Sequence, residues 1–142
     1  MQGLYFEDLA VGSSAEMTRV VGEADIVAFA QVSGDENPVH LDADYARTTS
    51  FGERIAHGML AGAYISAVLG TKLPGPGAIY LSQALTFRRP VRIGDAVTAR
   101  VTVKALDARR GRVTLETVCE VDGRTVVDGE AVVIAPRKPV AG

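Results

Sequence analysis

The chain has 142 residues, of which 47% are hydrophobic and 23% are charged, and its formal net charge is −2. A chain of this length can bury a core of its own, so we expect residues 1–142 to form a single domain. The composition excludes a disordered chain, and the small negative charge gives no reason to expect a nucleic-acid partner.

The start of the chain lacks the features of a secretory leader. Glu7 and Asp8 lie among its first ten residues, without a basic start or an apolar stretch. The longest apolar helical segment, residues 59–69, is too short to span a bilayer, which takes about 20 residues. Cys119 is the single cysteine, and we expect a buried, unreactive thiol. These features predict a cytoplasmic protein without a membrane partner.

The first half of the chain is predicted to be mostly helical. Gly34 follows apolar residues at helical spacing and is a plausible helix stop. Pro38 disfavours helix in the residue before it, which predicts a turn. Asp42 is a suitable cap for a following helix. The elements expected in this half are a strand at 15–21, a helix at 25–32, a turn at 35–38 and a short helix at 42–48.

The second half begins with the most apolar helix and continues as strands. The helix expected at 57–69 is apolar nearly all round, which predicts that it is buried. After Gly77 the hydrophobic period changes to two, and Asp122-Gly123 is a strong hairpin signal. We expect four long strands in an antiparallel meander, at residues 79–87, 97–105, 113–121 and 125–134.

This order of elements predicts an α+β fold in which an antiparallel sheet curls around the apolar helix. Such a sheet has open edges, and pairing two sheets edge to edge removes them, so we expect a homodimer that forms by sheet extension. Residues 136–142 contain two prolines and are expected to be a frayed tail.

One predicted loop holds a carboxylate, an amide and an imidazole, from Asp35, Asn37 and His40. Asp35 and His40 are five residues apart around a proline turn, so their side chains can converge on one water molecule. Both groups can exchange protons near neutral pH. Asp and Asn also cap loops by bonding nearby backbone amides. The spacing alone leaves both interpretations open.

Gly58 is predicted to begin the apolar helix, where backbone N–H groups are free and carry a partial positive charge. A glycine there lets a ligand approach these amides, which could stabilise a developing enolate as an oxyanion hole does. The alternative is that Gly58 allows close packing of the helix against the sheet. His57 is more consistent with a structural or capping role than with proton transfer.

These stretches resemble the R-specific enoyl-CoA hydratases of the MaoC-like, hot-dog-fold group. The similar segments cover nearly the whole chain and are Ser33-Gly34-Asp35-x-Asn37-Pro38-Val39-His40-x-Asp42, Ala46, Phe51, Ile55-Ala56-His57-Gly58-Met59-Leu60, Leu73-Pro74-Gly75-x-Gly77-x-Ile79-Tyr80-Leu81 and Phe87-x-x-Pro90-Val91-x-x-Gly94-Asp95. The resemblance implies a hot-dog fold and the syn addition of water to trans-2-enoyl-CoA. The product would be (R)-3-hydroxyacyl-CoA, and the reverse reaction a dehydration.

The resemblance also implies roles for single residues. Asp35 and His40 would hold one water and pass its proton, and Gly58 would supply the oxyanion-hole amide. Ser66 matches a serine that bonds the aspartate, and it lies two helical turns after Gly58, on roughly that face. Its alternative is a hydroxyl that bonds its own backbone. Asn37 would shape the loop or bond the water.

The resemblance further implies a substrate tunnel and no metal. Three candidate walls, otherwise ordinary core, are Ile65, Leu69 and Ile134. Arg88 and Arg89 could meet the phosphates of coenzyme A, or else be exposed charges at a strand end. No metal is expected, because the two histidines and the scattered carboxylates form no tight ligand cluster. Coenzyme A is part of the substrate, so no separate cofactor is expected.

Three other functions stay open. A (3R)-hydroxyacyl-acyl-carrier-protein dehydratase shares the motif and differs in its carrier, although no basic patch for an acidic carrier protein is obvious. A hot-dog acyl-CoA thioesterase would hydrolyse the C–S bond, but usually lacks a segment such as residues 35–40. A non-catalytic acyl-thioester-binding domain predicts binding without turnover.

Overall fold

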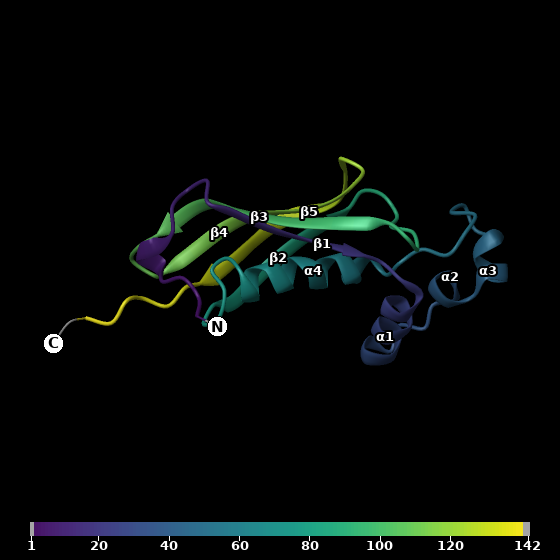
Figure 1. Ribbon diagram of the computed structural model, residues 1–142, viewed down its shortest axis with the longest axis horizontal. Helices are drawn as coiled ribbons and strands as arrows, with labels where there is room; N and C mark the ends of the chain where they lie inside the picture. The colour runs from purple at the N-terminus through teal and green to yellow at the C-terminus, as the bar shows by residue number, and fades with distance from the viewer. Residues whose placement is uncertain (1, 141–142) are drawn as a thin grey trace.

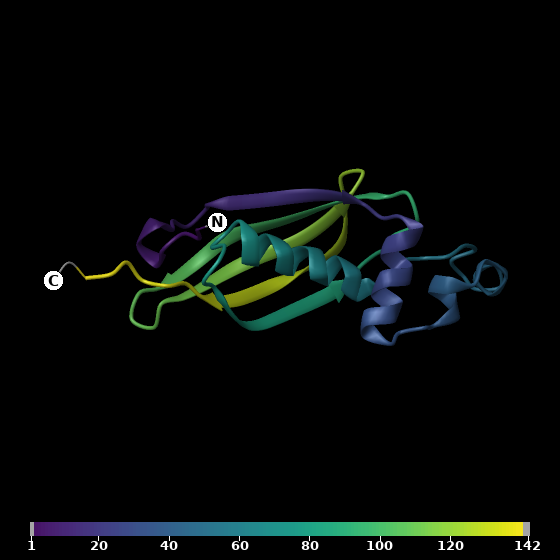
Figure 2. The ribbon, with the colours of Figure 1, turned by 60° about the horizontal axis from the view of Figure 1, so that its bottom comes forward.

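The computed structural model describes residues 2–140, and it shows one antiparallel sheet with a long helix along one face (Figure 1). The shorter helices gather beyond one end of the sheet (Figure 2). After a 3₁₀ turn at Phe6–Asp8, the elements are β1 (Ser14–Val20), α1 (Glu23–Ser33), α2 (Pro38–Leu41), α3 (Ala43–Arg47), α4 (Gly58–Thr71), β2 (Ile79–Phe87), β3 (Ala96–Asp107), β4 (Arg112–Val121) and β5 (Arg124–Ile134). The predicted α+β class is confirmed.

The five strands pair in the order β1-β3-β4-β5-β2. Strands β3, β4 and β5 form a meander, and Asp122 and Gly123 make the last turn with φ of 51° and 76°, as a type I′ turn requires. The prediction that β2 is part of this meander, next to β3, is wrong, because β2 pairs with β5 at the sheet edge. Alternating hydrophobicity predicts which face of a strand is buried, but not which strand lies beside it.

Alternate residues of β3 and β4 form the face of the sheet that lies against α4. They are Val97, Ala99, Val101 and Val103 on β3, and Val113, Leu115, Thr117 and Cys119 on β4. The sulfur of Cys119 lies 3.5 Å from the carbonyl oxygen of Ala61, and burial raises the pKa of this thiol to about 12. The prediction that this thiol is buried is confirmed, and the raised pKa supports the expectation that it is unreactive.

Helix α4 is buried on one side only. Ile65 and Leu69 are 0% and 2% exposed, whereas Met59 is 56% exposed. The prediction that the whole helix is buried is therefore wrong for a single chain, because the sheet covers one face and leaves the other open. Within residues 2–140, no helix is both long and apolar enough to cross a bilayer.

The C-terminal segment is attached to the start of the chain. The backbone carbonyl of Pro136 accepts a hydrogen bond from the N–H of Phe6 at 2.7 Å. The N–H of Lys138 donates to Glu7 at 2.6 Å, and its ammonium pairs with Asp8 at 2.9 Å. The prediction that the tail frays from residue 136 is therefore wrong for residues 136–138, and residues 141–142 lie outside the described part.

The ends of the short helices position the loop at residues 34–37. Gly34 ends α1 with φ of 79°, a left-handed conformation that glycine adopts without strain. The sequence did not predict α2, which is a single turn that begins at Pro38. Its cap is Asn37, whose side-chain oxygen accepts from the N–H of Val39 at 3.2 Å. Asp42 caps α3 as predicted.

Candidate active site

Asp35 lies in the exposed loop between α1 and α2, and hydrogen bonds hold its backbone and its side chain. Its N–H donates to the hydroxyl of Ser33 at 3.1 Å, and its Oδ1 accepts from the N–H of Asn37 at 3.2 Å. Its second carboxylate oxygen has no hydrogen-bond partner among residues 2–140. Asn37 therefore shapes the loop, while Asp35 keeps one oxygen free to accept a proton or a hydrogen bond.

His40 is 8% exposed and belongs to α2. Its Nδ1 lies 2.8 Å from the backbone oxygen of Ile55. A carbonyl only accepts, so Nδ1 carries the hydrogen and Nε2 of the neutral ring is bare. Nε2 has no partner in the described part of the chain. Burial is the largest effect on this ring and lowers the pKa of His40, against the hydrogen bond to Ile55, which raises it.

The lowered pKa of His40 predicts the pH dependence of a reaction in which its neutral ring accepts a proton. The base is present above that pKa and is lost as the pH falls through it. The acid limb of log kcat/KM, which reports the free enzyme, is therefore expected below the ordinary value of 6.5 for histidine. Initial rates between pH 4.5 and 8 check this, and an acid limb above pH 6.5 would contradict it.

His57 joins Asp35 and His40 in one cluster. One ligand-type atom from each of the three residues lies within 4.8 Å of the other two. The histidine rings stack with their centroids 3.9 Å apart and their planes 28° apart. The prediction that these groups form no tight cluster is therefore wrong, because the fold brings the start of α4 against the loop after α1.

The stacked rings do not suit a shared metal ion. A metal bound by imidazole lies near the plane of the ring, and two rings stacked face to face cannot both direct a nitrogen at one ion. We therefore expect that dialysis against EDTA leaves kcat on an enoyl-thioester substrate within twofold of the untreated value. A loss of activity that added Zn²⁺ or Mn²⁺ restores would contradict this expectation.

A cavity of about 330 Å³ opens beside the two histidines and the start of α4. Gly58, the first residue of α4, lines it, and its N–H has no hydrogen-bond acceptor within residues 2–140. A Cβ at Gly58 would lie 2.8 Å from the ring of Phe87. The apolar lining includes Val21, Ile55, Leu60, Ala61, Tyr64, Val91, Val97 and Val127. An apolar group can therefore occupy the cavity with a polar end at Gly58.

Tyr64 places its hydroxyl in this largely apolar surround, with the guanidinium of Arg19 5.9 Å from the centre of its ring. Its side chain lines the cavity and its oxygen is buried without a hydrogen bond in the described structure. Burial raises the pKa of Tyr64. Leaving a buried hydroxyl unpaired costs about 1–3 kcal/mol, so Tyr64→Phe is expected to raise the free energy of unfolding by about 1 kcal/mol.

Urea unfolding measures the effect of Tyr64→Phe, and Tyr45→Phe is the matched control. Tyr45 is 47% exposed, and removal of its hydroxyl is expected to change stability by less than about 0.5 kcal/mol. A loss of stability in Tyr64→Phe would mean that its hydroxyl does have a partner.

The walls predicted for the substrate tunnel are not the walls of this cavity. Ile65 and Leu69 lie in the core, and they and Ile134 are absent from the cavity lining. Positions three or four residues apart share a helix face, and the face next to the histidines is Leu60, Ala61 and Tyr64. Ile65, Leu69 and Ile134 therefore do not line this cavity, and their role as walls of a substrate tunnel stays a prediction.

Ser66 does not share the face of Gly58. It lines a second, shallower groove together with Met59, Gly62 and Ala63 from α4 and residues 80–83 and 85 around β2. Eight residues turn a helix by about 800°, which leaves Ser66 rotated by about 80° from Gly58. The prediction of a common face is wrong, and no hydrogen bond joins Ser66 to Asp35 in the described structure.

Arg88 and Arg89 do line the cavity, as the sequence suggested for groups that meet a substrate. Arg88 pairs with Asp128 at 3.2 Å, and Arg89 donates to the backbone oxygen of Thr125 at 2.6 Å. Both side chains are exposed, so they keep donors for an anion. Their role in binding phosphate stays a prediction.

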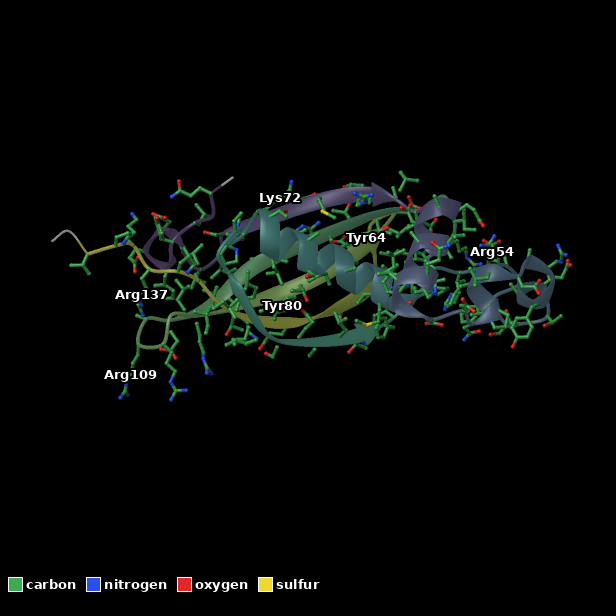
Figure 3. The ribbon with its side chains drawn as sticks, turned by 90° about the horizontal axis from the view of Figure 1, so that it is seen from below. Arg54, Tyr64, Lys72, Tyr80, Arg109 and Arg137 are labelled. Carbon is green, nitrogen blue, oxygen red and sulfur yellow. The ribbon has the colours of Figure 1, made fainter. Side chains whose placement is uncertain are left out.

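Arg54 is a contact of this site that the sequence did not reveal. It lies among the short helices at one end of the molecule, far from Arg109 and Arg137 at the other (Figure 3). Its Nε donates to the backbone oxygen of His40 at 2.7 Å, and its other nitrogens bind Glu23 at 2.7 and 3.2 Å. Glu23 and Arg54 are 31 residues apart, so no local sequence pattern predicts this ion pair.

An antiparallel sheet laid over a central helix, with a histidine-lined cavity where the helix starts, defines an enzyme-like protein of the hot-dog fold. The chain matches the family described as "MaoC like domain" over residues 9–125. It therefore belongs to the MaoC-like family.

The chain is similar over most of its length to several members of this family. It is 54% identical to a Rhodospirillum rubrum protein named (R)-specific enoyl-CoA hydratase, over 94% of this chain and 93% of that one. It is 51% identical to a Methylorubrum extorquens protein named 3-hydroxybutyryl-CoA dehydratase, over 97% and 88%. The solved structure of R-hydratase PhaJ1 from Pseudomonas aeruginosa has a TM-score of 0.91 and 48% identity, over 99% and 93%.

Proposed function

We propose that the protein is an (R)-specific enoyl-CoA hydratase, which adds water to trans-2-enoyl-CoA and also catalyses the reverse dehydration. The observation that carries this proposal is that His40 and Gly58 line one apolar cavity, and that the Asp35 carboxylate lies within 4.8 Å of a ring nitrogen of His40. The names of its close relatives in R. rubrum and M. extorquens support the same reaction.

The three groups have complementary tasks in this reaction. The substrate's acyl chain lies in the cavity, with its thioester oxygen at the N–H of Gly58, which stabilises the enolate that forms. Asp35 and His40 hold one water between them. As its oxygen adds to C3, an O–H bond breaks, and the water's proton passes to His40 Nε2. His40 then returns this proton to C2 on the same face, so the water supplies both new bonds and no cofactor is consumed.

We further propose that the protein is a homodimer, with the second copy seated on the groove beside Ser66. The edge strand β2 has one unpaired side, and large apolar residues remain exposed on it and on α4, which are Met59, Ile79, Tyr80, Leu81 and Phe87. Exposed apolar groups next to an open edge favour pairing with another copy. The test is sedimentation of the wild type and of Ala63→Arg, expected to be a dimer and a monomer respectively.

The dimer would also give Ser66 a position near the reaction. In a dimer whose two-fold axis passes the middle of α4 at Gly62, position 66 of one copy lies opposite position 58 of the other, because both are four residues from the axis. Ser66 of one copy would then approach Asp35 of the other, and Leu69 and Ile134 would follow it toward the partner's acyl chain. Loss of activity in the monomeric Ala63→Arg would support this arrangement.

An enoyl-CoA hydratase and a (3R)-hydroxyacyl-acyl-carrier-protein dehydratase differ in the carrier of the acyl group. A carrier-protein dehydratase would need a broad basic surface for an acidic protein, whereas the arginines that line the cavity are Arg88 and Arg89. Two arginines are enough to meet the phosphates of coenzyme A. We therefore propose coenzyme A as the carrier.

The test is the loss of enoyl absorbance when the purified protein is added to crotonyl-CoA, with chiral analysis of the product. Formation of (R)-3-hydroxybutyryl-CoA supports the proposal. Turnover of enoyl-acyl-carrier-protein alone would favour the dehydratase, and release of free thiol would mean a thioesterase. Binding of crotonyl-CoA without any turnover would indicate a non-catalytic acyl-thioester-binding domain.

A further inference from the structure

His57 is the buried histidine of the site for which the proposed reaction has no task. It is 3% exposed and directly precedes Gly58. The sequence left a structural or a capping role open for His57, and its side chain makes no capping hydrogen bond to α4. Instead its Nε2 lies 2.9 Å from the backbone oxygen of Asp35, 22 residues earlier.

This hydrogen bond is the one long-range tether of the loop that carries Asp35. The other hydrogen bonds of residues 34–37 in the described structure join residues at most four apart, such as Asn37 N–H to Asp35 and His40 N–H to the Asn37 carbonyl. All four loop residues are exposed, so packing adds little to hold them. Without the His57 donor, the carboxylate of Asp35 would move relative to the start of α4.

His57 also fixes the ring of His40. One face of the His57 ring stacks on His40 at 3.9 Å, and Phe29 lies against it at 4.8 Å. His40 itself is tied to a different segment, through Arg54 and the carbonyl of Ile55. His57 therefore contacts both Asp35 and His40, and it adjoins Gly58 in the chain.

The geometry of His57 does not suit a proton carrier. Its Nε2–H is engaged with a carbonyl, which accepts a hydrogen bond but does not take up a proton near neutral pH. Its Nδ1 is buried without a partner in the described structure, so no group is placed to exchange a proton with it. The ring contacts the rings of His40 and Phe29 and is hydrogen-bonded at one nitrogen, as a spacer would be.

We propose that His57 is a positioning residue of the hydratase site, which sets the Asp35 carboxylate relative to the Gly58 amide through its Nε2–H bond to the Asp35 carbonyl, and holds the His40 ring by stacking. The expected effect of His57 on kcat rests on the proposed function, whereas the hydrogen bond from His57 to the loop does not. A shift of about 1 Å in a catalytic group can lower a rate by about 10²-fold.

Two variants separate the contribution of the His57 ring from that of its hydrogen-bond donor. His57→Phe keeps a flat ring between His40 and Phe29 but lacks the donor. His57→Gln loses the ring but carries an amide N–H near the position of Nε2. We expect kcat for crotonyl-CoA to fall about 10- to 100-fold in His57→Phe, with KM within about threefold of the wild type, and His57→Gln to recover most of the loss. Thermal unfolding confirms that both variants are folded.

Coupling to Asp35 separates positioning from a general loss of structure. Because His57 acts through Asp35, His57→Phe is expected to lower kcat less than threefold in an Asp35→Asn background. A folded His57→Phe with wild-type kcat would overturn the proposal. So would a His57→Gln as slow as His57→Phe, or full additivity with Asp35→Asn.

Hydrogen–deuterium exchange tests the tether without any substrate. Faster exchange of the amides of residues 35–37 in His57→Phe than in the wild type is expected, with exchange in β3 and β4 unchanged. Unchanged exchange in the loop would overturn the tether, whatever the protein catalyses. A wild type that does not hydrate enoyl-CoA but whose loop loosens in His57→Phe would instead overturn the proposed function alone.

Discussion

His40→Asn is expected to lower kcat for the hydration of crotonyl-CoA by at least about 10²-fold, because it removes the proton acceptor of the reaction. The amide nitrogen of asparagine lies where Nδ1 of histidine lies, so the variant can still donate to the Ile55 carbonyl, 2.8 Å away in the wild type. What it lacks is the bare Nε2. The loss therefore reports the chemistry rather than the anchoring of α2, and steady-state kinetics measures it.

The variants His40→Ala and Asp35→Asn are measured in the same kinetic assay as His40→Asn. His40→Ala removes the base and the anchor, so it is expected to be as slow as His40→Asn and also less stable. Asp35→Asn keeps the side-chain oxygen that accepts from Asn37 N–H but loses the charge, and we expect a comparable fall in kcat. Near-wild-type rates in a folded His40→Asn would remove His40 from the mechanism.

Gly129→Ala is expected to have the largest effect on stability. A Cβ at Gly129 would lie 1.7 Å from the carbonyl oxygen of Ala84 and 2.7 Å from its carbon, so strand β2 cannot keep its present distance from β5. Overpacking against backbone costs about 3 kcal/mol where neither strand can move away. Displacement of β2 also moves Phe87 at its end, so activity is expected to fall with stability.

Urea unfolding compares Gly129→Ala with Gly70→Ala. Gly70 lies in α4, and a Cβ there meets nothing within 4 Å. Alanine is favoured over glycine in a helix by about 1 kcal/mol, so this control is expected to be as stable as the wild type or more so. A loss of less than about 1 kcal/mol in Gly129→Ala would contradict the close pairing of β2 with β5.

Local patterns in the sequence were sufficient to predict the elements but not their partners. Period-two alternation predicted all four long strands, and the bounds of β2 agree with the predicted 79–87. Gly34, Asp42 and Asp122-Gly123 act where predicted because each depends on its own backbone conformation. At the edge of the sheet, β2 pairs with β5, whose Gly129 lies 42 residues beyond the end of β2, and no local period predicts such a pairing.

The residues of the candidate site likewise differ in whether the sequence could predict their contacts. Asp35 and His40 are near in sequence, and the loop between them is short enough for the motif to predict their meeting. His57 and Arg54 reach the same place from a later segment, through contacts 22 and 14 residues apart. The sequence did not predict which residues line this cavity, because that depends on which face of α4 turns toward the histidines, and a helix with apolar residues all round does not reveal that face.

The central claim is that one water, held by Asp35 and His40, supplies both the hydroxyl and the proton on one face of the enoyl group. Hydration of crotonyl-CoA in D₂O, followed by NMR of the product, tests it most directly. The account predicts (R)-3-hydroxybutyryl-CoA with a single deuterium at C2, on the same face as the new hydroxyl. Deuterium on the opposite face, or an (S) hydroxyl, would contradict it.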